Sequence, residues 1–158
     1  MIGTKYPIEI LSQDDDDGTI VANVLEFENQ VIGRRIVNVQ KTDYVDPKGW
    51  NSATDALEIT LDNGKKVYLV DTNDCCAHTE LQAFLWNADK VDHVITGVGT
   101  TDGYDTWHIY ADMGDVLALT VGWGCGNPFY YGYGFDIAVT TLPEGYLPTN
   151  VKTIQEGN

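Results

Sequence analysis

The densest group of chemically capable side chains lies in Thr72–Glu80, where Cys75 and Cys76 are adjacent and His78 follows two residues later. Thiolates and imidazoles are ligands that zinc prefers. The spacing is poor for zinc, because adjacent residues of a strand point to opposite faces of a sheet. We therefore predict no metal at Cys75, Cys76 and His78 and no cofactor, and we interpret one cysteine as a small buried side chain. A zinc site here would need a fourth ligand from Cys125, His93 or His108.

Nucleophilic catalysis has no recognisable motif in this chain. A cysteine nucleophile needs a histidine beside its thiolate, and no known motif places one there. The two serines, Ser12 and Ser52, lie outside any Gly-x-Ser-x-Gly elbow, and there is neither a phosphate-binding loop with lysine nor a dinucleotide fingerprint. We predict that the protein is not an enzyme and has no catalytic residues.

A glycine- and aromatic-rich segment, Gly124–Phe135, has the composition of a binding loop. Tyrosine offers a large contact area with a polar tip, and glycine lets the backbone bend to fit a partner. We predict partner contacts by Phe129, Tyr130, Tyr131 and Tyr133. The alternative is that these aromatics only cover a sheet while the glycines form a turn or bulge. The four tryptophans are interpreted as core or rim packing: Trp50, Trp86, Trp107 and Trp123.

The net charge excludes several partners. Lysine and arginine total 9 against 24 aspartate and glutamate residues, which gives a formal charge of −15 over 158 residues. Phosphate backbones and anionic membrane surfaces are repelled by such a protein, so we expect no nucleic acid and no membrane as partners. The charge favours solubility, and it also suits attraction to a basic protein or mimicry of DNA.

The start of the chain shows no signal peptide, and three cysteines without a secretion signal predict free thiols. We expect a cytosolic protein. Four consecutive carboxylates, Asp14–Asp17, repel one another and predict a solvated loop. We divide the chain into an acidic N-terminal arm, 1–18, one β-rich domain, 19–142, and a polar C-terminal tail, 143–158. The two ends have the character of arms that become ordered against a partner.

Two hairpins are the clearest local features. Leu57, Ile59 and Leu61 alternate with polar residues before an Asn-Gly turn at Asp62–Lys65, and Val67–Val70 follows. A second pair of alternating segments flanks a turn at Asp112–Asp115. Further strands are expected at Arg34–Gln40, with Val37 and Val39 on one face, at Val91–Val98, and at Phe135, Ile137 and Val139.

Other segments leave alternatives open. Thr19–Asn29 fits a strand or a short helix, Thr79–Trp86 fits either a helix face or a strand, and Asp43–Ala53 is rich in turn formers and predicts a loop. The fold class that follows is mostly β, with α+β possible. It is one compact domain with an antiparallel sheet, hairpins and at most one or two short helices.

The order of these segments also carries a resemblance. Asp74-Cys75-Cys76 after a hairpin, followed by the Gly124–Phe135 segment, resembles an uncharacterised family of small proteins of phages that infect actinobacteria, over roughly Val31 to Val139. The resemblance implies a phage origin and a fold unit but no activity. The family pattern holds the Asp-Cys-Cys motif more faithfully than a histidine at His78, which weakens the zinc interpretation.

Together these observations predict a non-catalytic phage protein that acts by protein–protein contact, first as a virion accessory protein that decorates a capsid or tail. An acidic intracellular inhibitor or sponge of a host or defence protein is the second alternative. A zinc-binding module or metal-dependent enzyme is the third. The expected partner is a phage shell or a basic host protein, a homo-oligomer is possible, and the location is the host cytoplasm during infection or the virion.

Overall fold

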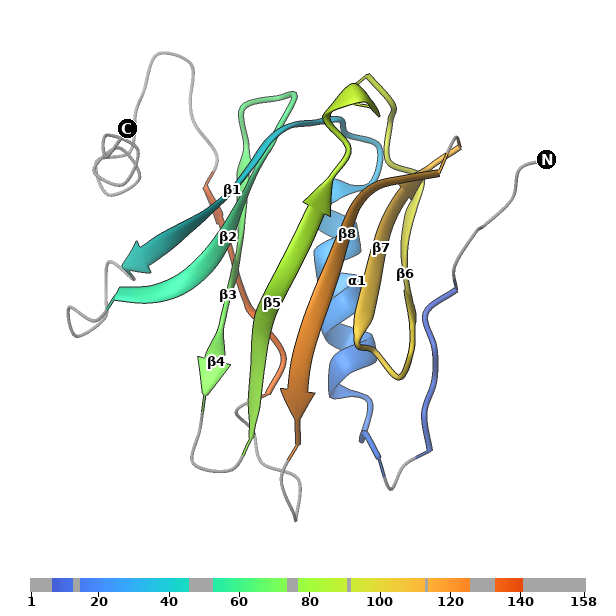
Figure 1. Cartoon of the computed structure of the whole chain (residues 1–158), viewed down its shortest axis with the longest axis vertical. Coiled ribbons are helices and arrows are strands. Elements are labelled where there is room, and N and C mark those ends of the chain that lie inside the picture. The colour runs from blue at the N-terminus through green and yellow to red at the C-terminus, as the bar shows by residue number, and fades with distance from the viewer. Residues whose placement is uncertain are drawn as a thin grey trace.

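One α-helix lies against the inner side of two antiparallel sheets in the computed structural model of the chain (Figure 1). The structure describes residues 7–12, 15–45, 53–73, 77–90, 92–112, 114–125 and 133–140. The predicted fold class is confirmed: the described chain is mostly β, its sheets are antiparallel, and it has one α-helix and one short 3-10 helix. No helix in these ranges is long and apolar enough to cross a membrane.

The first sheet has the strand order β1-β2-β3-β9, and the second has the order β4-β5-β8-β7-β6. The strands of the first sheet are β1 (Ile36–Val45), β2 (Ala53–Leu61), β3 (Lys66–Val70) and β9 (Asp136–Thr140). Those of the second are β4 (Thr72–Asn73), β5 (His78–Trp86), β6 (Gly97–Thr101), β7 (Thr106–Ala111) and β8 (Gly114–Gly124). A 3-10 helix, η1 (Ala88–Lys90), follows β5. Only Asp71 separates β3 from β4, so the chain passes directly from one sheet to the other.

Both predicted hairpins are confirmed. β2 pairs with β3 around the Asn-Gly turn, where Gly64 has a φ of 88° that glycine adopts without strain. β7 pairs with β8, and a bulge between Ile109 and Tyr110 lets β8 begin at Gly114. The alternating residues of these strands, such as Ile59 and Leu119, are buried in the main core as the period-two pattern predicts.

Two strand predictions need correction. The strand predicted at Val91–Val98 begins instead at Gly97, and its glycines do not break it. Tyr110 lies over Gly97, where a Cβ atom would come within 2.4 Å of the tyrosine hydroxyl oxygen, so packing requires glycine here. In β1, Val37 does not share a buried face with Val39: a bulge leaves Val37 44% exposed.

The ambiguous segment at Thr19–Asn29 is a helix, α1 (Thr19–Val31), and Thr79–Trp86 belongs to strand β5. The buried residues of α1 recur at helical spacing: Ile20, Asn23, Val24, Phe27 and Val31. They face an aromatic centre in which Trp107 lies between Phe27 and Phe135, with ring centroids 6.3 Å and 5.3 Å away. Trp107 is fully buried and Trp86 and Trp123 are partly buried, as predicted, whereas Trp50 lies outside the described residues.

The described part of the N-terminal segment packs against the domain. The N–H of Thr100 donates to Pro7 O, and the carboxylate of Glu9 accepts the N–H groups of Gly103 and Tyr104. The prediction of a solvated acidic loop is wrong for Asp16, which is only 4% exposed. Its carboxylate accepts the N–H groups of Gly18 and Ile20, because the first turn of α1 leaves backbone donors without helical partners.

Candidate functional site

The predicted contact residue Tyr133 is buried, so this part of the contact prediction is wrong. Tyr133 is 5% exposed, its ring stacks on Trp123, and its hydroxyl donates to carboxylate oxygens of Asp16, at 2.9 Å, and of Asp17. Burial and the hydrogen bond to Asp17 raise the pKa of Tyr133. Its role is to fasten the acidic segment to the core. Phe129, Tyr130 and Tyr131 lie outside the described residues.

The candidate metal ligands that the structure describes form no metal-binding group. Cys75 and Cys76 lie outside the described residues. His78, the first residue of β5, lies beside Gly124 at the end of β8. His93 pairs with Asp112 at 3.6 Å, and the Cys125 thiol donates to Asp15 O at 3.4 Å. Burial, together with the neighbouring aspartates, raises the pKa of the Cys125 thiol, which disfavours the thiolate. Among the described residues no three His, Cys, Asp or Glu side chains are placed to hold a metal ion.

A polar row that sequence reasoning missed crosses three strands of the second sheet. His108 Nδ1 lies 2.9 Å from Asp115 Oδ2, and His108 Nε2 lies 2.8 Å from Thr101 Oγ1. Hydroxyl, imidazole and carboxylate in this order resemble a nucleophile, a base and an orienting group. Acyl transfer also needs backbone N–H donors for an oxyanion, but along this row β7 pairs with β6 on one side and with β8 on the other, so its backbone donors are used within the sheet. We therefore assign the row to holding the three strands together.

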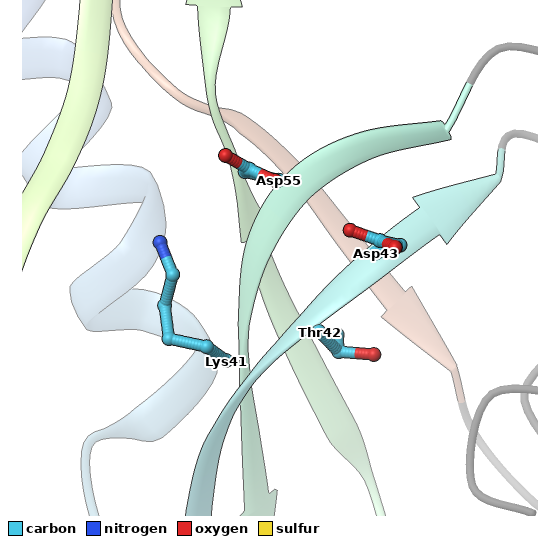
Figure 2. A pocket seen from close by; sticks show the side chains of 4 residues that line it. All are labelled: Lys41, Thr42, Asp43 and Asp55. Atoms are coloured by element: carbon cyan, nitrogen blue, oxygen red, sulfur yellow. The ribbon is translucent and has the colours of Figure 1, made fainter. Parts of the chain in front are cut away.

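A pocket-like hollow lies at a two-stranded extension of the first sheet (Figure 2). Pairing of β2 with β3 begins at Ala56, whereas pairing of β1 with β2 continues to Val45 and Ala53. Residues 43–45 and 53–55 therefore extend past the third strand, and Figure 1 shows β1 and β2 projecting from the body. Together with residues 41 and 42, at the base of this extension, we call them the distal ribbon. The hollow measures about 470 Å³ and is lined by Lys41, Thr42, Asp43 and Asp55.

The strand register places two like charges opposite each other at the hollow. Asp43 and Asp55 are directly opposite each other in the antiparallel register, and like charges in such a pair destabilise a sheet. The N–H of nearby Asp71 donates to Asp55 O at 3.0 Å. The pKa of Asp71 is raised, chiefly by burial, which outweighs the hydrogen bond from Leu81 and the charge of Lys41; Asp55 and Glu80 add smaller increases.

The model of a protein family, described as a domain of unknown function (DUF7448), matches residues 29–137. The chain belongs to this family. The DUF7448 region runs from the last turn of α1 to the start of β9, so it contains the distal ribbon, the hollow and Asp71. The prediction of an uncharacterised family is confirmed. No curated protein and no solved structure matches the chain.

Within the DUF7448 region, the hollow was not predicted because Asp43–Ala53 was interpreted as a loop. That interpretation is wrong for Asp43, Tyr44, Val45 and Ala53, which are strand residues, while 46–52 lie outside the described residues. The turn-forming residues within the segment favoured a loop, so the end of β1 and the start of β2 were not recognised as strand residues. Asp43 and Asp55 are 12 positions apart in sequence, and only the strand register brings them together.

Proposed function

We propose that this protein is a phage protein that acts without catalysis, as a virion accessory protein that contacts another protein through the distal ribbon. The supporting observation is the opposed pair Asp43 and Asp55 in an open hollow. Natural sheets rarely keep a like-charged pair without compensation, and departures from such rules concentrate at functional sites. A cation supplied by a partner removes the repulsion.

The hollow fits an arginine or lysine side chain of a protein better than a free metal ion. Two carboxylates are too few ligands for a calcium cage, and the Lys41 side chain, which also lines the hollow, points away from Asp43 (Figure 2). A guanidinium group binds carboxylates in a planar, bidentate geometry. The partner we propose is therefore a protein that presents a basic side chain on a protruding surface.

A phage origin is supported by the Asp74-Cys75-Cys76 motif and the Gly124–Phe135 segment, which resemble proteins of actinobacteriophages. A projecting ribbon is suited to clasping a neighbouring subunit of a shell, which favours the virion role. The acidic hollow also favours a second candidate, an inhibitor that occupies a basic host or defence protein. Both roles use the same contact surface and differ in the partner.

Photo-cross-linking from the distal ribbon tests the proposal. Benzoylphenylalanine replaces Thr42 at the hollow in the full chain, and Thr120, an exposed residue of β8, receives the same substitution as a matched control. Infected cells and purified particles are irradiated, and adducts are identified by mass spectrometry. We expect adducts from position 42 with a phage shell protein, present in particles, and few or none from position 120.

Adducts from position 42 with a host protein, absent from particles, select the inhibitor role instead. The proposal of a ribbon contact is wrong if both positions give the same adducts or if position 42 gives none while the protein is present in particles.

A further inference from the structure

Strand β1 is an open edge of the first sheet. Within the described ranges it is hydrogen-bonded to β2 and to no other strand, and its 10 residues extend over about 33 Å. An open edge offers backbone donors and acceptors to another strand. The bulge at Val37 and the charge of Lys41 disfavour non-specific pairing along this edge. A partner strand must therefore match the charges that lie beside the edge.

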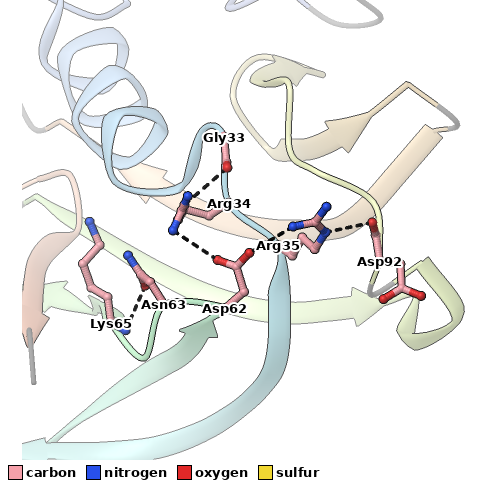
Figure 3. Close-up of polar contacts among 7 residues, drawn as sticks. All are labelled: Gly33, Arg34, Arg35, Asp62, Asn63, Lys65 and Asp92. Atoms are coloured by element: carbon pink, nitrogen blue, oxygen red, sulfur yellow. Dashed lines mark hydrogen bonds and ion pairs between the residues drawn. The ribbon is translucent and has the colours of Figure 1, made fainter. Parts of the chain in front are cut away.

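A basic corner lies at the start of β1 (Figure 3). It consists of Arg34, Arg35 and Lys65, which are three of the six lysine and arginine residues in the described part of the chain. The Asp62 carboxylate forms ion pairs with both arginines, at 3.5 Å from Arg34 and 3.3 Å from Arg35. The arginine side chains remain 41% and 47% exposed. Asp92, whose backbone O accepts the Arg35 Nε–H at 3.1 Å, also lies here, so three cations against Asp62 and Asp92 leave one surplus positive charge in a protein whose net charge is −15.

The basic corner and the acidic hollow lie at opposite ends of the same edge strand. Arg35 and Asp43 are eight positions apart, which corresponds to about 26 Å along a strand. That distance exceeds the screening length of roughly 8 Å at physiological salt. The two patches therefore cannot neutralise each other within one molecule. Two chains placed antiparallel along β1 bring each basic corner to the other chain's hollow, and two-fold symmetry makes both contacts at once.

We propose that the partner of this edge is a second copy of the chain, docked antiparallel along β1, with Arg34 and Arg35 of each copy at Asp43 and Asp55 of the other. This names a second copy, instead of a shell or host protein, as the partner at the hollow, and it rests on the premise of the proposed function that the distal ribbon is a contact surface. The contact continues the first sheet from one copy into the next. Each copy supplies the cation that the opposed aspartates lack.

Charge-reversal variants of the full chain test this proposal by analytical ultracentrifugation. We expect the wild type to sediment as a dimer in 50 mM NaCl and to dissociate with added salt. Arg34→Glu with Arg35→Glu, or Asp43→Lys with Asp55→Lys, should each raise the dimer Kd by roughly tenfold or more. An equimolar mixture of the two double variants should recover a heterodimer, because every reversed patch then faces an opposite charge.

A matched control, Glu26→Lys with Asp105→Lys, changes the net charge as much as the aspartate reversal does but at exposed sites away from β1, and it should leave the Kd unchanged. Melting curves check that each variant is folded, and Asp43→Asn with Asp55→Asn provides a milder variant if the lysines prevent folding. A monomeric wild type at 100 μM, or two reversed variants that do not form a heterodimer on mixing, overturns the proposal.

The dimer and the proposed function can fail separately. If the chain is monomeric while a photo-cross-linker at position 42 still captures another protein, only the dimer is wrong. If the dimer forms and no cross-link to another protein is found, only the proposed function is wrong.

Discussion

Single residues show most clearly where this fold carries an electrostatic cost. Asp71 lies between β3 and β4 and must bend the chain from one sheet into the other. Its carboxylate accepts the N–H of Leu81 at 3.1 Å, which fixes the start of the second sheet. Its pKa is nonetheless raised, chiefly by burial. The hydrogen bond is thus useful to the fold, whereas the charge is not.

Replacing Asp71 by asparagine should therefore stabilise the protein at neutral pH. The amide keeps the oxygen that receives Leu81 N–H and removes the buried charge. A raised folded-state pKa means that the contribution of Asp71 is most favourable below the unfolded value of about 4 and is lost as pH rises through the folded value. We expect Asp71→Asn to raise Tm by roughly 2–4 °C at pH 7, the shift that an increase of about 1 kcal/mol in the free energy of unfolding produces in a domain of this size. The gain should shrink towards pH 3.

Thermal melts of both proteins from pH 3 to pH 8 measure this difference. Asp71→Ala, which also removes the hydrogen bond, is the control and should gain less than asparagine does. A lower Tm for Asp71→Asn at pH 7 would show that the charge itself stabilises the junction.

At the scale of elements, helix α1 is joined to the sheets by a side chain that acts as a piece of backbone. Asn23 is 8% exposed, its Nδ2 donates to Phe135 O at 2.9 Å, and its Oδ1 accepts Phe135 N–H at 2.8 Å. This pair of bonds copies the pattern that two antiparallel residues exchange in a sheet. The helix is thereby held to the chain that enters β9.

Asn23→Ala should destabilise the fold strongly, because it leaves both the N–H and the C=O of Phe135 buried without a partner. Each such loss costs about 1–3 kcal/mol, so we expect a decrease of roughly 2–4 kcal/mol in the free energy of unfolding, measured by urea denaturation. Leu25→Ala on the same helix is the control: Leu25 is 44% exposed and its truncation should cost little. Equal effects of the two variants would contradict the proposed clamp.

At the scale of the whole molecule, charge decides which partners can approach. The net charge of −15 repels a phosphate backbone over most of the surface, and the basic corner is small and shares its charge with Asp62. We expect no binding of random duplex DNA at physiological salt in a gel-shift experiment with micromolar protein. A shift that weakens with added salt would be the signature of phosphate contacts and would contradict this expectation.

The local features of this fold follow from the sequence alone. Period-two alternation beside an Asn-Gly turn depends only on neighbouring residues, so both hairpins and the fold class were predictable. Membership of an uncharacterised family was also expected from the sequence, and the family match confirms it. The sequence left open whether α1 would be a helix or a strand, because its apolar residues fit both the helical and the strand period over so short a stretch. The start of β6 was missed, since its glycines are explained by a tyrosine on another strand.

Only the tertiary structure decided where the charges and aromatics lie. Burial of Asp16 and Tyr133 depends on a contact between positions more than a hundred residues apart, and composition suggested exposure for both. The opposition of Asp43 and Asp55 arises from strand register, and the separation of the basic corner from the acidic hollow arises from the length of β1. These are non-local pairings, and a sequence pattern reports only the period of an element and not the neighbour against which it packs.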